Sequence, residues 1–317
     1  MSSADVWLNK RGRRRQKVNV MVDPRFLPLM KRPEFFTDVP ESKDNGLLNG
    51  EKRQPGEYYY HADRISPFMR NPFIISRYRI NYTTWESIQS LFWVHNETSN
   101  QWSHLLSAVY FLWLALWSSS SFPGGDAFFF TVFCLGAVTS FSLSVLFHTF
   151  GTTPAGVDRW MPIDVAGITI LTTGGYLLLD HVLFAEFLAL RYIYLSISLL
   201  LGFVQIGFTT HQRVRHMPFL KATVIASCVI SQMVLPVTHF SFLYGLSQTV
   251  FLVWPFFFEF LTLSIGVFAY VSKAPESIFP GRFDIFGASH LFFHIAATVA
   301  AYMHFAICAR IRAVLMQ

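Results

Sequence analysis

Charged residues are scarce in this chain of 317 residues. Asp, Glu, Lys and Arg make up only 14% of it, whereas hydrophobic residues make up 52% and include 34 Phe. A soluble domain of this length could not easily bury so much apolar surface. The composition therefore predicts a membrane protein.

Cysteine is also rare, and the usual signals for secretion and lipid anchoring are absent. Cys134, Cys228 and Cys308 are far apart within apolar stretches, which excludes a disulfide framework or a Cys-x-x-Cys metal site and leaves packing as their simplest role. The basic amino terminus is followed by no apolar run, so we expect no cleavable signal peptide, and the last residues include no cysteine for a prenyl group. Attachment to a membrane is then expected to depend on spanning helices.

The first third of the chain is polar. Residues 1–80 mix Pro, Gly, Asp, Asn and basic residues without a sustained apolar period, which predicts a largely disordered cytosolic segment, with a folded or docking segment as the alternative. In residues 81–101, Trp85, Ile88 and Leu91 recur on one helical face, which predicts a short helix at the membrane surface.

Residues 102–317 contain seven long apolar runs. Each run is near the roughly 20 residues that a helix needs to cross a hydrocarbon core about 30 Å thick. The connections are short, so successive helices should be antiparallel neighbours. The pattern predicts an all-α membrane protein with a seven-transmembrane-helix bundle, whose spans are expected at about 102–121, 127–149, 161–180, 188–208, 220–240, 249–271 and 288–309.

The distribution of basic residues predicts the orientation. Of the 25 Lys and Arg, 16 lie before residue 102. With the amino end in the cytosol, the inner loops hold six further basic residues and the outer side three, so the carboxyl end is expected to be extracellular or lumenal. This orientation is opposite to that of G-protein-coupled receptors, and their Asp-Arg-Tyr and Asn-Pro-x-x-Tyr motifs are absent from the sequence.

Several polar residues fall at the expected cytosolic ends of the spans, where each is a candidate for function. His290 and His294 are spaced i, i+4, so one helical face offers two nitrogens to one metal, and His148 supplies a third. Three histidines with a fourth position open to water are typical of catalytic zinc. Asp164 can orient the water or take its proton, and Ser144 can hydrogen-bond the water or a substrate carbonyl. Histidines that are merely bonded to polar neighbours are the alternative, because an HxxxH pair alone is a weak signal.

The remaining polar residues within the spans give weaker signals. His104, His181, His239 and His304 each occur singly, near helix ends or on apolar faces, and are expected to cap or pack. Glu259 lies near the middle of the sixth expected span with no evident cationic partner. The sequence leaves open whether this carboxyl is protonated or lines an internal cavity.

Four segments carry a recognisable pattern, namely the runs HNETSNQWSHL (95–105), SVLFHT (144–149), IDVAGI (163–168) and KAPESIFPGRFDIFGASHLFFH (273–294). With these segments the chain resembles the progestin and adipoQ receptor family, which includes the adiponectin receptors and is related to the haemolysin III proteins. The resemblance covers about residues 65–310, in order and with the family's spacing. Details near Ser272 and Gly287 are most similar to the third numbered member of the family.

The resemblance implies a seven-helix bundle with a cytosolic amino end and a zinc ion held by residues matching His148, His290 and His294, with Asp164 and Ser144 beside the water. Some members of the family are credited with zinc-dependent hydrolysis of a ceramide amide. The loop after His148 lacks the Cys-His-Ser run of the adiponectin receptors, which argues against their substrate or hormone.

The resemblance supports two functions. The first is a lipid amidase that acts on ceramide-like membrane lipids. The second is a receptor or scaffold with a structural zinc, which binds an extracellular or steroid ligand or recruits a cytosolic signalling partner through the amino segment. No nucleic-acid partner is expected, and the Golgi or the plasma membrane is the expected location.

The orientation can be tested with epitope tags. A tag within the first 60 residues should be reached by antibody only after permeabilisation, and a tag after Gln317 should be reached from the extracellular or lumenal side, because the basic residues keep the amino end inside. Asn81 and Asn96 match the glycosylation pattern but should remain unmodified. Both tags on one side would contradict seven spans, and a glycan at either Asn would contradict the orientation.

Overall fold

The computed structural model describes the backbone of residues 4–7 and 17–20, and residues 46–48, 52–53, 56–66, 69–211 and 232–316. The chain forms two compact units, residues 1–41 and 42–317. In the first unit, strand β1 (Ala4–Trp7) pairs with β2 (Lys17–Val20) in an antiparallel register that places Ala4 opposite Val20. The sequence predicted no strands in this segment.

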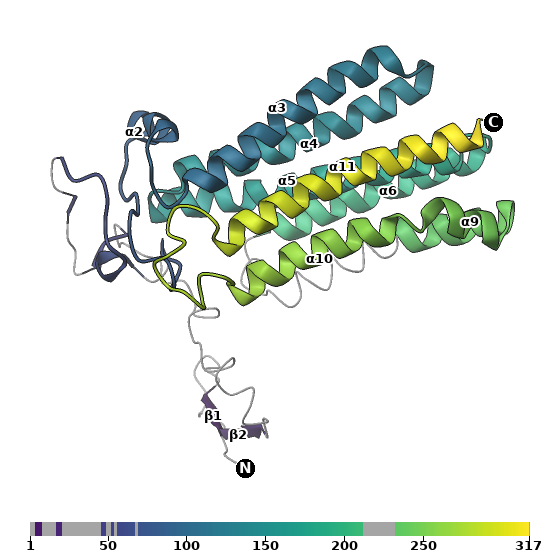
Figure 1. Ribbon diagram of the computed structural model, residues 1–317. Coiled ribbons are helices and arrows are strands. Elements are labelled where there is room, and N and C mark those ends of the chain that lie inside the picture. The colour runs from purple at the N-terminus through teal and green to yellow at the C-terminus, as the bar shows by residue number, and fades with distance from the viewer. Residues whose placement is uncertain are drawn as a thin grey trace. The chain divides into compact units, whose positions relative to one another are not determined.

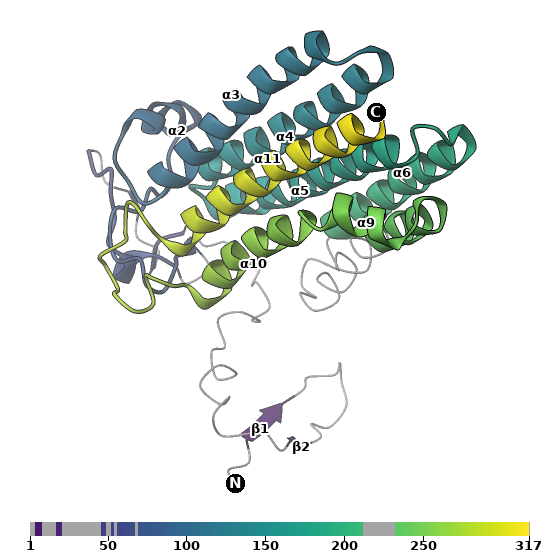
Figure 2. The ribbon, with the colours of Figure 1, turned by 45° about the vertical axis from the view of Figure 1, so that its right-hand side comes forward.

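The second unit is a bundle of long helices (Figures 1 and 2). Its helices are α3 (Thr98–Ser121), α4 (Gly124–Phe150), α5 (Pro154–Leu183), α6 (Leu188–Thr210), α9 (Leu246–Val253), α10 (Phe256–Ser272) and α11 (Ser289–Leu315). α3 and α4 lie on one side and α9 and α10 on the other, with α11 between them. α11 packs against α3, α5 and α10, and therefore connects both sides.

The described residues include four helices that are long and apolar enough to cross a membrane, namely α4, α5, α6 and α11. α9 and α10 are a fifth candidate if they form one span. Together they are long and apolar enough, but they meet at a bend of 42°. α3 coincides with the first expected span, yet its serine-rich ends keep it outside this group. Most of the expected span 220–240 lies outside the described residues, although residues 232–244 are helical.

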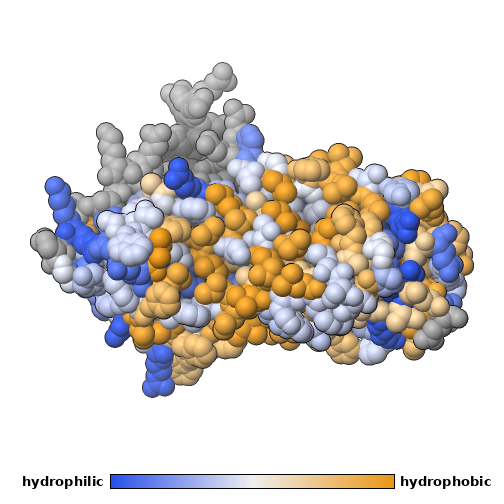
Figure 3. Space-filling model, turned by 90° about the horizontal axis from the view of Figure 1, so that it is seen from above, coloured by the Kyte–Doolittle hydropathy of each residue, from blue (hydrophilic) through white to orange (hydrophobic). Residues whose placement is uncertain are grey.

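The outer surface of the bundle is apolar over its middle. Large hydrophobic side chains are exposed there, among them Leu200, Phe203, Phe260 and Ile265. Figure 3 shows apolar residues over the middle of one face and hydrophilic residues towards both ends. This pattern fits a surface that meets hydrocarbon rather than water.

α4 and α5 approach each other closely near the polar end of the bundle. A Cβ atom at Gly167 would lie 3.1 Å from the Cα of Ser140, so a larger residue there would have to push the two helices apart by a few tenths of an ångström. α5 begins where Thr153 accepts a hydrogen bond from the Gly156 backbone N–H at 2.9 Å, with Pro154 at the first helical position. These features bring Asp164 on α5 to the face of α4 that carries Ser144 and His148.

The described residues between 46 and 97 fold against the end of the bundle at which α11 begins (Figure 1). Leu47, Tyr60, Ile65, Ile74, Tyr78 and Ile80 form a buried hydrophobic cluster. This packing differs from the disorder that the sequence predicted through residue 80. The physical reason is that these apolar residues follow no helical or strand period, so only their tertiary contacts reveal them. Segment 46–97 is called the amino-terminal cap below.

The short helix expected before the first span is present in the cap as two elements. α2 (Thr84–Gln89) continues into the 3₁₀ helix η5 (Ser90–Phe92), and η3 (Ala62–Arg64) precedes both. α2 starts with a capping box in which Thr83 and Glu86 exchange side-chain and backbone hydrogen bonds. Trp85 and Phe92 remain exposed, which suits a helix that meets an apolar surface.

Two acidic residues attach the loop 273–288 to the cap and to α11. Asp284 accepts hydrogen bonds from the backbone N–H of Ile75 at 3.0 Å and from that of Ser76 at 2.9 Å. Glu276 is fully buried and accepts from the backbone N–H and the hydroxyl of Ser289 at 2.7 and 2.5 Å. An anion at this position also stabilises the amino-terminal end of the α11 dipole. The first turn of α11 is therefore fixed from outside the helix.

We predict that Asp284→Asn loosens the contact between this loop and the cap, because an amide replaces one acceptor oxygen with a donor that faces the Ser76 or Ile75 N–H. Hydrogen bonds to a charged group are worth about 1.5–3 kcal/mol, so amide exchange at Ile75 and Ser76 should accelerate at least about 10-fold. Hydrogen-exchange mass spectrometry measures this change. Asp63→Asn is the control, since Asp63 is 73% exposed. Equal exchange in both variants would contradict the role of Asp284.

Candidate metal centre

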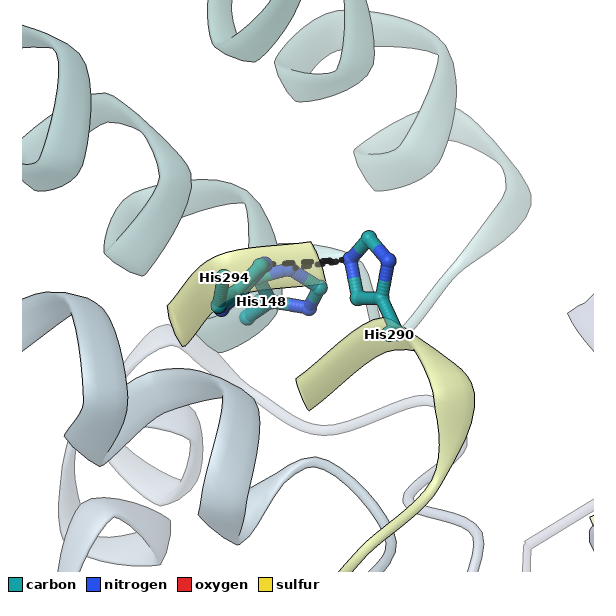
Figure 4. A group of neighbouring side chains, drawn as sticks. All are labelled: His148, His290 and His294. Carbon is teal, nitrogen blue, oxygen red and sulfur yellow. Dashed lines mark hydrogen bonds between the residues drawn. The ribbon is translucent and has the colours of Figure 1, made fainter. Parts of the chain in front are cut away.

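Three histidines converge at the end of the bundle that is covered by the amino-terminal cap (Figure 4). His148 lies in the last turn of α4, and His290 and His294 lie in the first two turns of α11. The Nε2 atom of His290 is 3.1 Å from that of His148 and 3.2 Å from that of His294. The structure thus brings together the three histidines that the sequence singled out as a ligand set, and they are a group that can hold a metal ion.

The backbone of His148 is held in place by the cap and by α3. Its carbonyl oxygen accepts hydrogen bonds from the Arg79 guanidinium at 2.5 Å and from the Gln101 amide at 3.1 Å. Arg79 also donates to the Thr149 carbonyl at 3.3 Å. These carbonyls belong to the last turn of α4, where a cation complements the helix dipole. Burial lowers the pKa of Arg79 to about 10, so the guanidinium stays charged at neutral pH.

A carboxylate sets the orientation of the His148 ring. The Nδ1 atom of His148 is 2.8 Å from the Oε2 atom of Glu97, which also accepts from the Asn100 amide at 2.7 Å. A carboxylate oxygen accepts, so Nδ1 carries the proton and donates. The Nε2 atom of a neutral ring then presents a lone pair to the cluster.

The same reasoning assigns the tautomer of His294. Its Nδ1 atom is 3.0 Å from the Ser103 hydroxyl, whose single proton is donated to the Asn100 carbonyl at 3.0 Å. The Ser103 oxygen therefore accepts from Nδ1–H, and the Nε2 atom of His294 presents a second lone pair. Both lone pairs face Nε2 of His290. The Nδ1 atom of His290 is buried and has no hydrogen-bond partner within the described part of the chain.

This arrangement fits a metal ion. Ligand nitrogens about 2.0–2.1 Å from a tetrahedral ion lie roughly 3.3 Å from one another, close to the two spacings seen here. A cation also relieves the repulsion between lone pairs that face each other. Imidazole ligands suit zinc, copper, iron and nickel, and partners such as Glu97 and Ser103 on the second ring nitrogens are typical of such centres.

A cavity of about 250 Å³ lies beside the histidines. At the histidine end, Ser144, Asp164, His290 and His294 all line it. The two residues that the sequence placed around a metal-bound water are therefore at the same cavity as two of the histidines. Most of the remaining wall is apolar, with Phe133, Phe141, Leu171, Leu179, Phe256 and Phe260 among its residues.

The sequence analysis linked none of three residues that contact the cluster to the metal site. Glu97 and Ser103 hold two of the imidazoles, and the His104 ring stacks on that of His294 with 3.5 Å between centroids. All three lie in the 95–105 run that carried the family resemblance. The expectation that His104 is an isolated histidine is wrong.

Two further pairs also correct the sequence analysis. Glu259 does have a partner within the bundle, because its Oε1 atom is 3.2 Å from Nδ1 of His304, a side chain that is cationic when protonated. His181 is not isolated either, since its Nε2 atom is 2.7 Å from Oδ1 of Asp126. These pairs connect α10 with α11 and α4 with α5. His239, expected to cap or lie at an interface, contacts the Tyr194 hydroxyl at 3.2 Å.

Comparisons with known proteins agree with this architecture. Residues 92–305 match the family described as Haemolysin-III related. The chain is 31% identical over 227 residues to the adiponectin receptor protein of Drosophila melanogaster (68% of this chain, 51% of that protein). It is 31% identical over 252 residues to mouse progestin and adipoQ receptor family member 3 (73% and 78%). The ADIPOR-like receptor IZH3 of Saccharomyces cerevisiae is 35% identical over 183 residues (52% and 33%).

The chain therefore belongs to the haemolysin-III related family. Its relatives are named as adiponectin receptors and as progestin and adipoQ receptors, so the resemblance seen in the sequence is confirmed. With its apolar helices, the chain is an integral multi-pass membrane protein. The aligned part spans about half of the fly protein and a third of the yeast protein. The chain is equally identical to the fly protein and to the mouse protein, which is the third numbered member of its family. The particular likeness to that third member therefore stays a prediction.

We predict that His294→Ala abolishes metal binding, because it leaves two ligands. Glu97→Gln should weaken binding by only about 10–100-fold, since it removes a partner of a ligand rather than a ligand. Metal content measured after competition with a graded series of chelators distinguishes the two losses. His239→Ala is the control, and its metal content should equal that of the wild type. If His239→Ala lost metal as readily as His294→Ala, the ligand assignment would fail.

Proposed function

We propose that this protein is a zinc-dependent hydrolase of lipid amides, with ceramide-like lipids as the substrate class. The observation that carries the proposal is the convergence of three histidine Nε2 atoms beside an apolar cavity that is lined by Asp164 and Ser144. A structural zinc site needs four protein ligands, whereas the described cluster offers three, as in catalytic sites.

The proposal includes a bundle of seven spans, with the amino end in the cytosol and the carboxyl end outside. The segment 1–80 and the interfacial helix 81–101 then lie on the cytosolic side, and residues 102–317 form the membrane domain. The excess of basic residues before residue 102 supports this orientation. The metal centre lies near the cytosolic surface in this arrangement, and the Golgi or the plasma membrane is the proposed location.

Zinc held by His148, His290 and His294 would polarise an amide carbonyl and lower the pKa of water to about 7. To hold the ion, each imidazole must be neutral and must point a nitrogen lone pair toward it. Glu97 and Ser103 favour this state by fixing the proton of His148 and of His294 on Nδ1, which leaves the Nε2 lone pairs free for the ion. A ligating histidine that donates its second ring N–H to a carboxylate is typical of zinc sites.

The side chains of the cavity transfer the proton and bind the substrate in the proposed reaction. Asp164 takes a proton from the attacking water as the C–O bond forms and the carbonyl oxygen takes the negative charge. It then passes the proton to the leaving nitrogen, so that the C–N bond breaks and the carbonyl re-forms. The Ser144 hydroxyl hydrogen-bonds the substrate at the carbonyl. The apolar walls hold the acyl chain, which reaches the site from the bilayer without crossing water.

A receptor or scaffold is the second candidate, and a specific contact favours it. The Arg79 side chain joins the amino-terminal cap directly to the His148 carbonyl, so a partner that moves the cap would move a metal ligand. In this role the protein would recruit a cytosolic signalling partner through its amino segment, or bind an extracellular or steroid ligand. The names of the fly and mouse relatives, which refer to receptors, support such a role.

Asp164→Asn separates the two functions. The amide keeps the size of the side chain and can hydrogen-bond, but it cannot accept a proton at neutral pH. Zinc content and folding should be retained, and ceramide hydrolysis by purified protein should fall by about 10²–10⁴-fold, the usual contribution of general-base catalysis.

Asp180→Asn is the matched control for this experiment. Asp180 is another buried carboxylate of α5, but it is not part of the cavity wall, and it accepts a hydrogen bond from Ser198. This substitution should leave turnover within about 3-fold of the wild-type value, because the amide oxygen of the new Asn side chain still accepts the hydrogen bond from Ser198. If the wild type hydrolyses ceramide no faster than a variant without the three histidines, the hydrolase proposal is wrong and the receptor reading replaces it.

A further inference from the structure

The cavity continues from the metal centre to a second polar site. Its wall includes Glu259 and His304 as well as His290 and His294. His304 follows His294 by ten residues on α11, so the two imidazoles are separated by about 15 Å along the helix axis. Between them the helix offers the cavity only alanines, at positions 297, 300 and 301. Small side chains there leave room for a narrow apolar passage with a polar group at each end.

The hydrogen bonds at the second site fix where its protons lie. The Nε2 atom of His304 is 2.9 Å from the Gly175 carbonyl, which can only accept, so Nε2 is protonated. The Nδ1 atom is 3.2 Å from Oε1 of Glu259, and this contact needs one proton on either atom. In both cases Oε2 of Glu259 is left as an acceptor.

This second carboxyl oxygen has no partner in the described portion of the molecule, although it is buried. An acceptor without a donor is costly at membrane depth, where lipid tails offer none. A purely structural link between α10 and α11 needs only the Oε1 contact. The position of Glu259 in the cavity wall makes a donor on a bound molecule the natural partner for Oε2.

We infer that Glu259 and His304 form a subsite for a hydroxyl group carried on an aliphatic chain, about 15 Å from the polar head that lies at the metal centre. The inference rests on the proposed function, in which that head is the acyl carbonyl or the product carboxylate. The passage fits the chain, and the acceptor oxygen fits the hydroxyl. A methyl group or an ether oxygen at the same position gains nothing from Oε2, because neither donates a hydrogen bond.

Three fatty acids test the subsite on zinc-loaded protein in lipid nanodiscs. An extended chain of about 12 carbons spans the distance of about 15 Å, so the probes are dodecanoic acid and its 12-hydroxy and 12-methoxy derivatives. Their dissociation constants come from displacement of radiolabelled dodecanoic acid. The hydroxy acid should bind about 10-fold more tightly than either of the others, the effect of one hydrogen bond to a carboxylate.

Glu259→Gln is the informative variant, because its amide keeps the shape but offers a donor where the carboxylate offered an acceptor. The preference for hydroxy over methoxy acid should fall to less than about 2-fold. The matched control is Asp180→Asn, which removes a buried carboxylate of α5 outside the cavity wall and should keep the full preference. Thermal unfolding of each variant verifies that it is folded.

Several outcomes would overturn the subsite. They are equal binding of the hydroxy and methoxy acids by the wild type, no binding of any of the three, or an unchanged preference in folded Glu259→Gln protein. Ceramide hydrolysis by the same preparations keeps the two proposals distinguishable. A hydroxyl preference without hydrolysis supports the subsite and removes the hydrolase, whereas hydrolysis without the preference removes the subsite alone.

Discussion

Hydrocarbon offers no hydrogen-bond partner, so polar side chains inside a membrane bundle must satisfy one another. This constraint explains why three buried imidazoles pair with acids from other elements: His148 with Glu97, His304 with Glu259, and His181 with Asp126. Each pair joins two elements that follow one another in the chain, through residues 51, 45 and 55 positions apart. The pairs therefore hold the bundle together and also fix which ring nitrogen carries a proton. At the metal centre this second effect decides the chemistry, because a ligand must present a lone pair.

α11 is the element on which both polar sites depend. It provides His290 and His294 at one site and His304 at the other, with small residues between them along the cavity. Its first turn is fixed by Glu276, and its middle by the contact of His304 with Gly175 on α5. A straight helix keeps the two sites at a constant separation. Substitutions that tilt α11 should therefore affect both sites together, whereas substitution of Glu259 in α10 should affect only the second.

The sequence predicted the features that have local or periodic signals. The spacing of His290 and His294 places both on one face of a helix, and apolar runs located the helices that the structure describes. Glu97, 51 residues from His148, and Ser103, 191 residues from His294, have no such signal. Their roles depend on contacts between elements, which one sequence does not reveal. The same reason explains the cap, whose buried residues follow no period, and the pairing of Glu259 with His304.

Arg79 connects the receptor and hydrolase interpretations physically. Its guanidinium lies in the amino-terminal cap and is buried. It donates a hydrogen bond to the carbonyl of His148, whose imidazole belongs to the cluster of three histidines. It also donates to the Ser90 hydroxyl at 2.6 Å, at the start of η5, so the guanidinium connects this short helix to the last turn of α4. A charge without water must keep its partners, so displacement of η5 would either break costly bonds or draw α4 along. A partner bound to the cap would thus act on the position of His148, and signalling and catalysis would share one mechanical link.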